Sequence, residues 1–244
     1  MIHGPGGASL AALALLSACA SPSPSVRSWV EDEPARAAPG EPRRLPDLPD
    51  AFRAELRGGR APGCPLRGEA VYLGEGRFLT AAHLVDDIVP GMRHCSGAPI
   101  PTTIRFRDRV LHVRPVRIGQ GYVEPGVGPL YRQGQDLALL QAGMAPPGPA
   151  ARPCAGGPKQ GQPVLVLATN RREAVRAGPV VPESRPADGA YTDLPLPMAE
   201  GESGAGVFDL ESGCLLGIVS HRPDSMPGHV RIVPADAIRA FLGT

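Results

Sequence analysis

The chain has 244 residues and a formal net charge of +1, from 25 basic and 24 acidic residues. This balance provides no long-range field to attract nucleic acid, so a nucleic-acid partner is not expected. Glycine and proline number 31 and 30, which favours a turn-rich β protein over a helical bundle.

The N-terminal residues predict an export signal. Leu10–Leu16 is an apolar run, too short to span a bilayer but typical of the core of a signal peptide. It leads into Leu16-Ser17-Ala18-Cys19, which resembles the lipobox of bacterial lipoproteins, where cleavage precedes the cysteine and its sulfur carries lipid. We therefore expect residues 1–18 to be a signal peptide, with export to the bacterial cell envelope.

The lipobox resemblance implies lipidation of Cys19, and hence a membrane anchor. Ala20 follows the cysteine, whereas an Asp there favours inner-membrane retention in proteobacterial lipoproteins. The resemblance thus implies an outer-membrane lipoprotein, with the periplasm as the other expected location. The stretch before the apolar run has no Lys or Arg, which leaves open an ordinary cleaved signal with an incidental cysteine.

Residues 19–62 predict a tether. Proline is frequent and apolar periodicity is absent, so the segment buries too little apolar surface to offset its ordering entropy. We expect a disordered, Pro-rich tether that holds the body of the protein away from a membrane. A short helix near Asp50–Arg57 is a further expectation.

The body, residues 63–244, has the pattern of many short strands. A Gly-Glu-Gly turn at 74–76 predicts a hairpin, and other segments alternate apolar and polar residues or form short apolar runs. The predicted strands are Ala70–Leu73, Arg77–Thr80, Thr103–Phe106, Val110–Ile118, Val164–Ala168, Val207–Asp209 and Leu215–Val219. A helix is predicted over Pro234–Leu242, so the pattern indicates an all-β barrel or sandwich.

Three segments carry residue types that could react together. His83 follows a predicted strand end and two alanines, whose small side chains let the imidazole lie close to neighbouring backbone. Asp136 opens an apolar run, where a buried carboxylate needs a hydrogen-bonding partner. Ser203 stands in Gly-Glu-Ser-Gly-Ala-Gly, residues 201–206, and glycines there allow a tight turn whose N–H groups could bind an oxyanion.

These three residue types fit nucleophilic catalysis. A serine hydroxyl is a poor nucleophile at neutral pH, and a histidine within hydrogen-bond reach can take its proton and return it to the leaving amine. A buried aspartate fixes the histidine tautomer and stabilises the imidazolium. Asp86, Asp87 and Asp108 are competing carboxylates for this last role.

The segments Thr80-Ala81-Ala82-His83, Asp136-Leu137-Ala138-Leu139 and Gly201-Glu202-Ser203-Gly204 resemble, in this order, the motifs of the trypsin-like (chymotrypsin-fold) serine proteases. The resemblance is to their compact bacterial branch and extends to Gly217-Ile218-Val219 and to the closing helix. It spans about residues 63–244.

The resemblance implies an all-β fold of two six-stranded antiparallel β-barrels with a C-terminal helix. It implies a secreted serine endopeptidase that hydrolyses polypeptides through an acyl-enzyme, without a cofactor or a metal. His83 would be the general base, Asp136 its orienting acid and Ser203 the nucleophile. The backbone N–H groups of Gly201 and Ser203 would form the oxyanion hole.

The resemblance also indicates where the substrate binds. Residues before Ser203 and the strand after it would form the substrate pocket, with Met198, Val219, Ser220 and His221 as candidates. The floor position carries no acid, so a preference for Lys or Arg is not expected, and a small or apolar side chain is.

Glu202 stands before the serine where digestive members of the family have an Asp that pairs with a new N-terminus after activation. The long segment before the body argues against that arrangement. We therefore expect activity without propeptide cleavage.

The chain has five cysteines, none in a C-x-x-C pair, which argues against a zinc ribbon or a redox motif. Four of them lie in the body, which suits two disulfides in an oxidising compartment. Four cysteines allow three pairings, and the family resemblance implies Cys64–Cys95 and Cys154–Cys214.

Two alternatives remain beside the protease. An α/β-hydrolase esterase needs G-x-S-x-G followed by Asp and then His, but Ala205 takes the last glycine position and His83 and Asp136 precede Ser203. The other is a catalytically inactive lipoprotein with the same fold that acts as a binding module. A complete set of three catalytic residue types argues against it.

Overall fold

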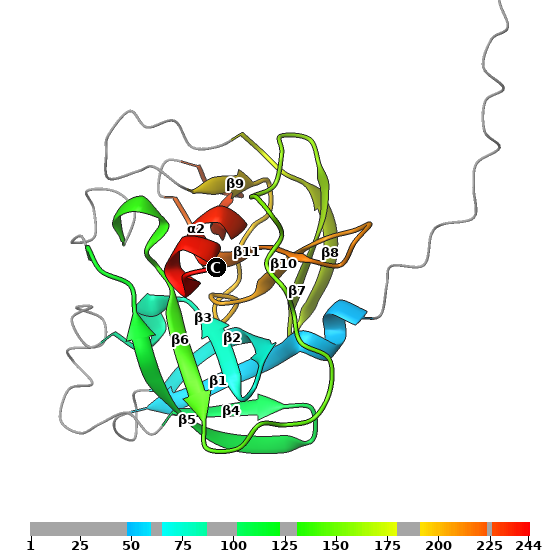
Figure 1. The fold of residues 1–244 in the computed structure, drawn as a ribbon. Coiled ribbons are helices and arrows are strands. Elements are labelled where there is room, and N and C mark those ends of the chain that lie inside the picture. Colours follow the sequence, from blue (N-terminus) through cyan, green and yellow to red (C-terminus); the bar gives the residue numbers. More distant parts are fainter. Residues whose placement is uncertain (1–47, 60–64, 87–101, 123–130, 180–190, 224–225) are drawn as a thin grey trace, which may run out of the picture. The chain divides into compact units, whose positions relative to one another are not determined.

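The computed structural model describes residues 48–59, 65–86, 102–122, 131–179, 191–223 and 226–244 (Figure 1). All of them belong to one compact unit, Arg44–Thr244. The predicted signal peptide, Cys19, and the cysteines of the predicted Cys64–Cys95 pair lie outside the described residues.

Six strands close a barrel in the first half of the described chain. After the 3-10 helix η1 (Leu48–Phe52) they are β1 (Arg53–Gly59), β2 (Pro65–Gly74), β3 (Arg77–Thr80), β4 (Thr102–Phe106), β5 (Arg109–Ile118) and β6 (Ala138–Ala142). They are hydrogen-bonded in the order β1-β2-β3-β6-β5-β4, and antiparallel pairing of β1 with β4 closes the barrel.

The sequence folds this way because its apolar side chains alternate inward. Tyr72, Phe78 and Phe106 form an aromatic cluster inside the barrel, with ring centroids 4.8 to 5.5 Å apart. The predicted β2–β3 hairpin is confirmed, and Gly74 and Gly76 adopt positive φ angles of 91° and 74° in its turn, a conformation that glycine adopts without strain.

Six further strands form a curled antiparallel sheet. They are β7 (Pro163–Ala168), β8 (Arg171–Arg176), β9 (Thr192–Leu194), β10 (Gly206–Asp209), β11 (Leu215–His221) and β12 (Val230–Pro234). Their order is β8-β7-β10-β11-β12-β9, with β8 and β9 as the edges among the described residues. The predicted all-β class with two six-stranded antiparallel barrels is thereby confirmed, the second barrel being a curled sheet in the described residues.

A helix follows the last strand, as predicted. The α-helix α2 spans Ala235–Leu242, begins after Pro234 and ends at Gly243, whose φ is 78°. Its Ile238 and Phe241 are buried, because the helix lays its apolar face on the strands. In the part of the chain that the structure describes, no helix has the length and apolar character needed to cross a membrane.

The two sheets share one apolar cluster, in addition to one cluster within each of them. Side chains of β2 and β3, such as Val71 and Leu79, pack in the same buried cluster as Phe208 and Ile218 of β10 and β11. The two sheets therefore pack against each other through this buried apolar cluster, which we call the joint. The segments that follow β3 and precede β10 lie beside it (Figure 1).

The predicted tether boundary at residue 62 is wrong. Residues 53–59, assigned to the disordered tether 19–62, form strand β1, which pairs with β2 and β4. The short helix expected near Asp50–Arg57 is also misplaced, since η1 ends at Phe52.

The physical reason is that the alternation of apolar and charged residues in this segment is too short to be recognised in the sequence. Ala54 and Leu56 are buried in the barrel, while the charged residues that flank and separate them, Arg53, Glu55 and Arg57, are more exposed. Two apolar residues do not predict a strand by themselves. The partner strands supply the hydrogen bonds that the segment needs, and one of these partners is about 50 residues away.

Candidate active site

His83 lies at the end of β3, within the 3-10 helix η2 (Ala82–Leu84). Ala81 and Ala82 before it are fully buried, so small side chains allow this short helix to pack against the barrel. The hydroxyl of Thr80 donates to the carbonyl oxygen of Glu69 at 2.6 Å, which fixes the strand end. The imidazole itself stays partly accessible, with 16% of its side chain exposed.

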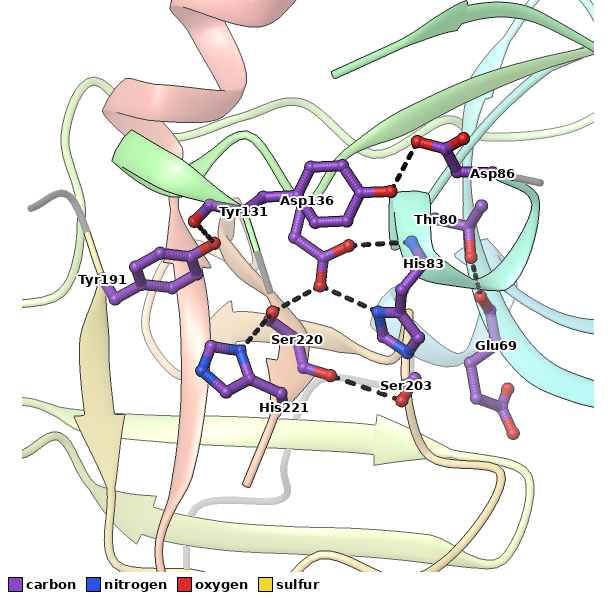
Figure 2. A network of polar contacts seen from close by, with 10 residues as sticks. All are labelled: Glu69, Thr80, His83, Asp86, Tyr131, Asp136, Tyr191, Ser203, Ser220 and His221. Atoms are coloured by element: carbon purple, nitrogen blue, oxygen red, sulfur yellow. Dashed lines mark hydrogen bonds and ion pairs between the residues drawn. The ribbon is translucent and has the colours of Figure 1, made fainter. Parts of the chain in front are cut away.

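Asp136 lies two residues before β6 and is fully buried. Its Oδ1 accepts from the backbone N–H of His83 and its Oδ2 lies next to Nδ1 of the same residue, both at 2.9 Å. The hydroxyl of Ser220 donates to Oδ2 at 2.5 Å. Figure 2 shows the carboxylate at the centre of these contacts.

Burial by itself raises the pKa of Asp136, but the charge of His83 and the hydrogen bonds from His83 and Ser220 outweigh it and lower this pKa to about 2. The group is therefore a carboxylate at neutral pH. Since a carboxylate only accepts, Nδ1 of His83 carries a proton, and Nε2 of the neutral ring is left as a proton acceptor.

The competing carboxylates lie elsewhere. Asp86 is buried and accepts from the hydroxyl of Tyr131 at 2.6 Å (Figure 2). Asp108 is exposed in the turn between β4 and β5, and Asp87 lies outside the described residues. Asp136 is thus the carboxylate that the fold brings to His83.

Ser203 lies in the turn before β10, held between the two sheets. Its carbonyl oxygen accepts from the N–H of Glu69 on β2 at 2.7 Å, and the N–H of Gly204 donates to Val219 on β11 at 2.8 Å. Gly204 has a φ of +86°, and a Cβ there would lie 2.0 Å from the Glu69 carbonyl oxygen. Glycine is required at this position because any side chain would push β2 away.

The Ser203 hydroxyl donates to the carbonyl oxygen of Ser220 at 3.3 Å (Figure 2). Over the described ranges, no hydrogen bond joins this hydroxyl to His83. The hydroxyl, His83 and Asp136 are nevertheless linked through Ser220, which contacts Ser203 by its carbonyl and Asp136 by its side chain.

The segment before the serine is held by an ion pair. Glu202 is 4% exposed; its Oε2 accepts from the N–H of Ala199 at 2.8 Å, and its Oε1 from Nε of Arg171 at 2.7 Å. Arg171 on β8 also donates to the carbonyl oxygen of Pro197 at 3.0 Å. These contacts fix the turn that contains Gly201, whose φ is +88°.

Sequence reasoning did not find Arg171. It lies 31 residues before Glu202, on an edge strand with three exposed neighbours. In the sequence it is indistinguishable from a surface arginine, and only the pairing of β8 with β7 turns it towards the serine segment.

A cavity of about 400 Å³ lies next to Ser203. Its walls are formed by Arg67, Leu84, Met198, Ala199, Glu200, Gly201, Ser203 and Arg222. Of the predicted pocket residues, Met198 belongs to this wall. Val219 and Ser220 are buried and His221 is partly buried, and none of the three belongs to the wall. The residues predicted for the pocket ended at His221 and did not include its neighbour Arg222.

The structure contains a disulfide between Cys154 and Cys214. It ties the segment before β7 to the turn between β10 and β11. Among the residues with described positions, no group of three or more His, Cys, Asp or Glu side chains could hold a metal ion.

Known structures share this fold at low sequence identity. The Rv3671c protease of M. tuberculosis, in its active form, is 19% identical with a TM-score of 0.58, over 83% of this chain and 86% of that one. A serine endoprotease from Yersinia pestis is 16% identical with a TM-score of 0.54, over 79% and 62%. A scabies mite inactivated protease paralogue is 14% identical with a TM-score of 0.55, over 80% and 94%.

No curated protein sequence matches the chain significantly. The family model of the trypsin-like peptidase domain matches residues 68–218, which is more than half of the chain and includes His83, Asp136 and Ser203. The predicted family is confirmed: the chain belongs to the trypsin-like peptidases.

Proposed function

We propose that the protein is a serine endopeptidase in which Ser203 is the nucleophile, His83 the general base and Asp136 its orienting acid. The observation that carries the proposal is the fully buried Asp136 carboxylate, which accepts two hydrogen bonds from His83 at 2.9 Å. A buried carboxylate held this way fixes the tautomer in which Nε2 can accept a proton.

In the proposed reaction the Ser203 oxygen attacks the carbonyl carbon of a peptide while Nε2 of His83 takes its proton. The imidazolium then gives this proton to the leaving amine, and water hydrolyses the acyl-enzyme with His83 again as base. The Ser203 hydroxyl donates to the carbonyl oxygen of Ser220, so the mechanism requires a rotation about the Cα–Cβ bond of Ser203 when substrate binds. Hydrogen bonds of this kind often tighten only in the complex with substrate.

The N–H groups of Gly201 and Ser203 would stabilise the oxyanion. We propose that Arg171 keeps this turn in place through Glu202, because the guanidinium provides the buried carboxylate with a permanent partner at 2.7 Å. An N-terminal amine released by cleavage is then not needed, and the unprocessed chain should be active.

The cavity beside Ser203 is the proposed site for the substrate side chain. Leu84, Met198 and Ala199 provide an apolar wall, which suits a small or apolar side chain. The same wall contains two basic residues, Arg67 and Arg222, and one acid, Glu200, so its positive balance would disfavour a Lys or Arg side chain. Profiling on a peptide library should therefore show apolar residues before the cleaved bond and a depletion of basic ones.

We also propose that the protein is exported to the cell envelope and anchored through a lipid on Cys19, on the basis of the lipobox resemblance. Metabolic labelling of a bacterial host with a clickable palmitate analogue tests the anchor. The wild-type chain should incorporate the label and the Cys19→Ala variant should not. Labelling of both, or of neither, would contradict the anchor.

A covalent serine-hydrolase probe tests the proposed chemistry. The wild-type protein should react with a fluorophosphonate, and Ser203→Ala should not. His83→Ala should react much more slowly, because the serine loses its base. A matched control is Ser212→Ala, which replaces an exposed serine in the β10–β11 turn and should leave labelling unchanged.

The other candidate is an inactive binding module with the same fold. The Ser203 hydroxyl donates to Ser220 rather than to His83, and one structural neighbour is an inactivated paralogue. A folded wild-type protein that neither reacts with the probe nor cleaves peptides would favour this candidate over the peptidase.

A further inference from the structure

His221 is the last residue of β11 and directly follows Ser220. Its Nδ1 lies 2.8 Å from the Ser220 hydroxyl oxygen. Its ring packs edge-on against Tyr191, with centroids 5.3 Å apart and an interplanar angle of 82°. Figure 2 shows His221 on the opposite side of Ser220 from His83, so that the Asp136 network has an imidazole at each end.

The hydrogen atoms of this network can be assigned by counting. The Ser220 oxygen lies 2.5 Å from Oδ2 of Asp136, and the carboxylate has no proton to offer at neutral pH. The serine must therefore donate its only proton to Asp136. Towards His221 the same oxygen can then only accept, so Nδ1 of His221 carries a proton and donates it.

The opposite tautomer of His221 would disrupt the network. With its proton on Nε2, the ring would present an acceptor at Nδ1 and compete with Asp136 for the single Ser220 proton. The edge-on contact with Tyr191 limits ring rotation, and the Tyr191 hydroxyl is itself engaged as a donor to the carbonyl oxygen of Tyr131 at 2.7 Å. The network thus selects the Nδ1–H form of His221.

We propose that His221 is a positioning residue of the active site: its Nδ1–H orients the Ser220 hydroxyl towards Asp136, and Ser220 in turn holds the carboxylate against His83. The role rests on the peptidase function proposed above. Ser220 would then link Ser203 to the His83–Asp136 pair, because its carbonyl oxygen accepts from the Ser203 hydroxyl and its side chain donates to Asp136.

Three substitutions of His221 distinguish the effect of its Nδ1–H donor from the effect of the volume of its ring. In His221→Asn the amide nitrogen occupies the position of Nδ1 and can donate to Ser220, whereas His221→Leu fills similar space without a donor. His221→Gln keeps a polar side chain but carries its amide one bond further out, so it tests the placement of the donor even if the Leu variant folds poorly. His112→Leu, on an exposed position of β5, is the matched control.

Steady-state kinetics on a peptide substrate should distinguish these variants. His221→Leu should lower kcat about tenfold with KM changed by less than about twofold, as expected for one lost hydrogen bond to a charged network. His221→Gln should fall nearly as far, and His221→Asn should recover to within about threefold of wild type. If Asn is as impaired as Leu, or if Leu has no effect, the proposal is wrong.

A double-variant cycle with Ser220→Ala tests the route. If His221 acts through Ser220, His221→Leu should have little further effect once the hydroxyl is absent, a change below about twofold. An equal loss in both backgrounds would mean that His221 acts by another route, and would overturn the proposal.

Nuclear magnetic resonance of protein with nitrogen-15-labelled histidine tests the hydrogen bond without any catalysis. At about pH 8 the His221 ring, identified by the signals missing in His221→Asn, should carry its proton on Nδ1. A proton on Nε2 would overturn the proposal even in an active enzyme. The Nδ1–H form in a protein that no probe labels would instead show that the peptidase function fails and the positioning contact stands.

Discussion

The two six-stranded units hold their parts of the site in different ways. The first barrel contains both His83 and Asp136 and joins them by two direct hydrogen bonds. The second contributes Ser203, whose backbone is bonded to Glu69 of the first barrel and, through Gly204, to β11 of the second. His83 is thus fixed mainly within one unit, while Ser203 is held by backbone hydrogen bonds to both units.

The means of stabilisation also differ. Within the described residues the first barrel is held by its buried aromatic and aliphatic core, and its charged site residue, Asp136, is stabilised by hydrogen bonds from His83 and Ser220. The second sheet adds an ion pair, Arg171–Glu202, and a disulfide. The comparison teaches that His83 is fixed mainly by the barrel that contains it, with one hydrogen bond to Asp136 from Ser220 of the second sheet, whereas the serine turn depends on restraints that reach across strands.

The largest expected effect comes from replacing the Asp136 carboxylate that is hydrogen-bonded to His83. Asp136→Asn keeps the shape but supplies an amide N–H that favours the wrong His83 tautomer, so kcat should fall roughly 10³- to 10⁴-fold. Peptide cleavage measured at neutral pH checks this. Asp108→Asn, at an exposed position of the same barrel, should be unaffected. An Asp136→Asn enzyme with a tenth of wild-type activity would contradict the assignment.

The disulfide tests a restraint of the second sheet. The bridge spans a sequence separation of 60 residues, which corresponds to about 4 kcal/mol of chain-entropy stabilisation in the loop-closure model. The variant Cys154→Ala/Cys214→Ala should lose roughly 2–4 kcal/mol in unfolding free energy, measured by urea titration. Because the bridge lies in the second half of the chain, the variant should keep the contact between His83 and Asp136. The nuclear magnetic resonance signals of His83 should therefore persist under native conditions. Unchanged stability would show that the bridge is not formed in solution.

The buried carboxyl group of Glu69 should make the free energy of unfolding depend on pH. Glu69 is 3% exposed, its Oε1 accepts from the N–H of Thr169 at 2.7 Å, and its Oε2 has no hydrogen-bond partner in the described part of the structure. Burial raises the pKa of Glu69 from 4.5 to about 7. The folded protein therefore binds more protons than the unfolded chain between these values, and stability falls as pH rises from about 4.5 to about 7.

Glu69→Gln removes this titration, because an amide does not ionise. The loss of unfolding free energy between about pH 5 and pH 8 should shrink by up to roughly 3 kcal/mol relative to wild type, as measured by urea titration at both pH values. Glu211→Gln, in an exposed turn, is the control and should leave the difference unchanged. A pH dependence identical to wild type in Glu69→Gln would show that Glu69 ionises freely in the native state.

The smallest expected effect tests the ion pair of the serine turn. Arg171→Met leaves the buried Glu202 without its cation, while the partial exposure of Arg171, 18% of its side chain, moderates the loss to about 1–2 kcal/mol. Probe labelling of Ser203 should also slow about tenfold, since the Gly201 turn loosens. Arg176→Met on the same strand is the control. Full activity of Arg171→Met would reject the proposed role of this pair.

Local patterns predicted much of the fold and several site residues. The hairpin around Gly74–Gly76 and the helix ending at Gly243 follow from turn and capping preferences that act over a few residues. His83, Asp136 and Ser203 could be singled out because each lies in a short segment with a distinctive composition. These features depend on neighbours in the chain, and for that reason the sequence shows them.

Other features depend on partners far away along the chain. Strand β1 is stabilised by pairing with β2 and β4, and Arg171 meets Glu202 across 31 residues. Arg67 of β2 and Arg222, which directly follows β11, line the same cavity. None of these contacts has a local signal.

By itself, the sequence predicted the all-β class from alternation and turns, which are local properties. Through three short motifs that resemble those of the trypsin-like peptidases, it also predicted the two-unit plan and singled out His83, Asp136 and Ser203. Only the tertiary structure decided which carboxylate meets His83, which cation accompanies Glu202 and how His221 joins Asp136 through Ser220. The physical reason is that these choices are made at the joint of two sheets, where hydrogen bonds and buried charges are satisfied by residues that only folding brings together.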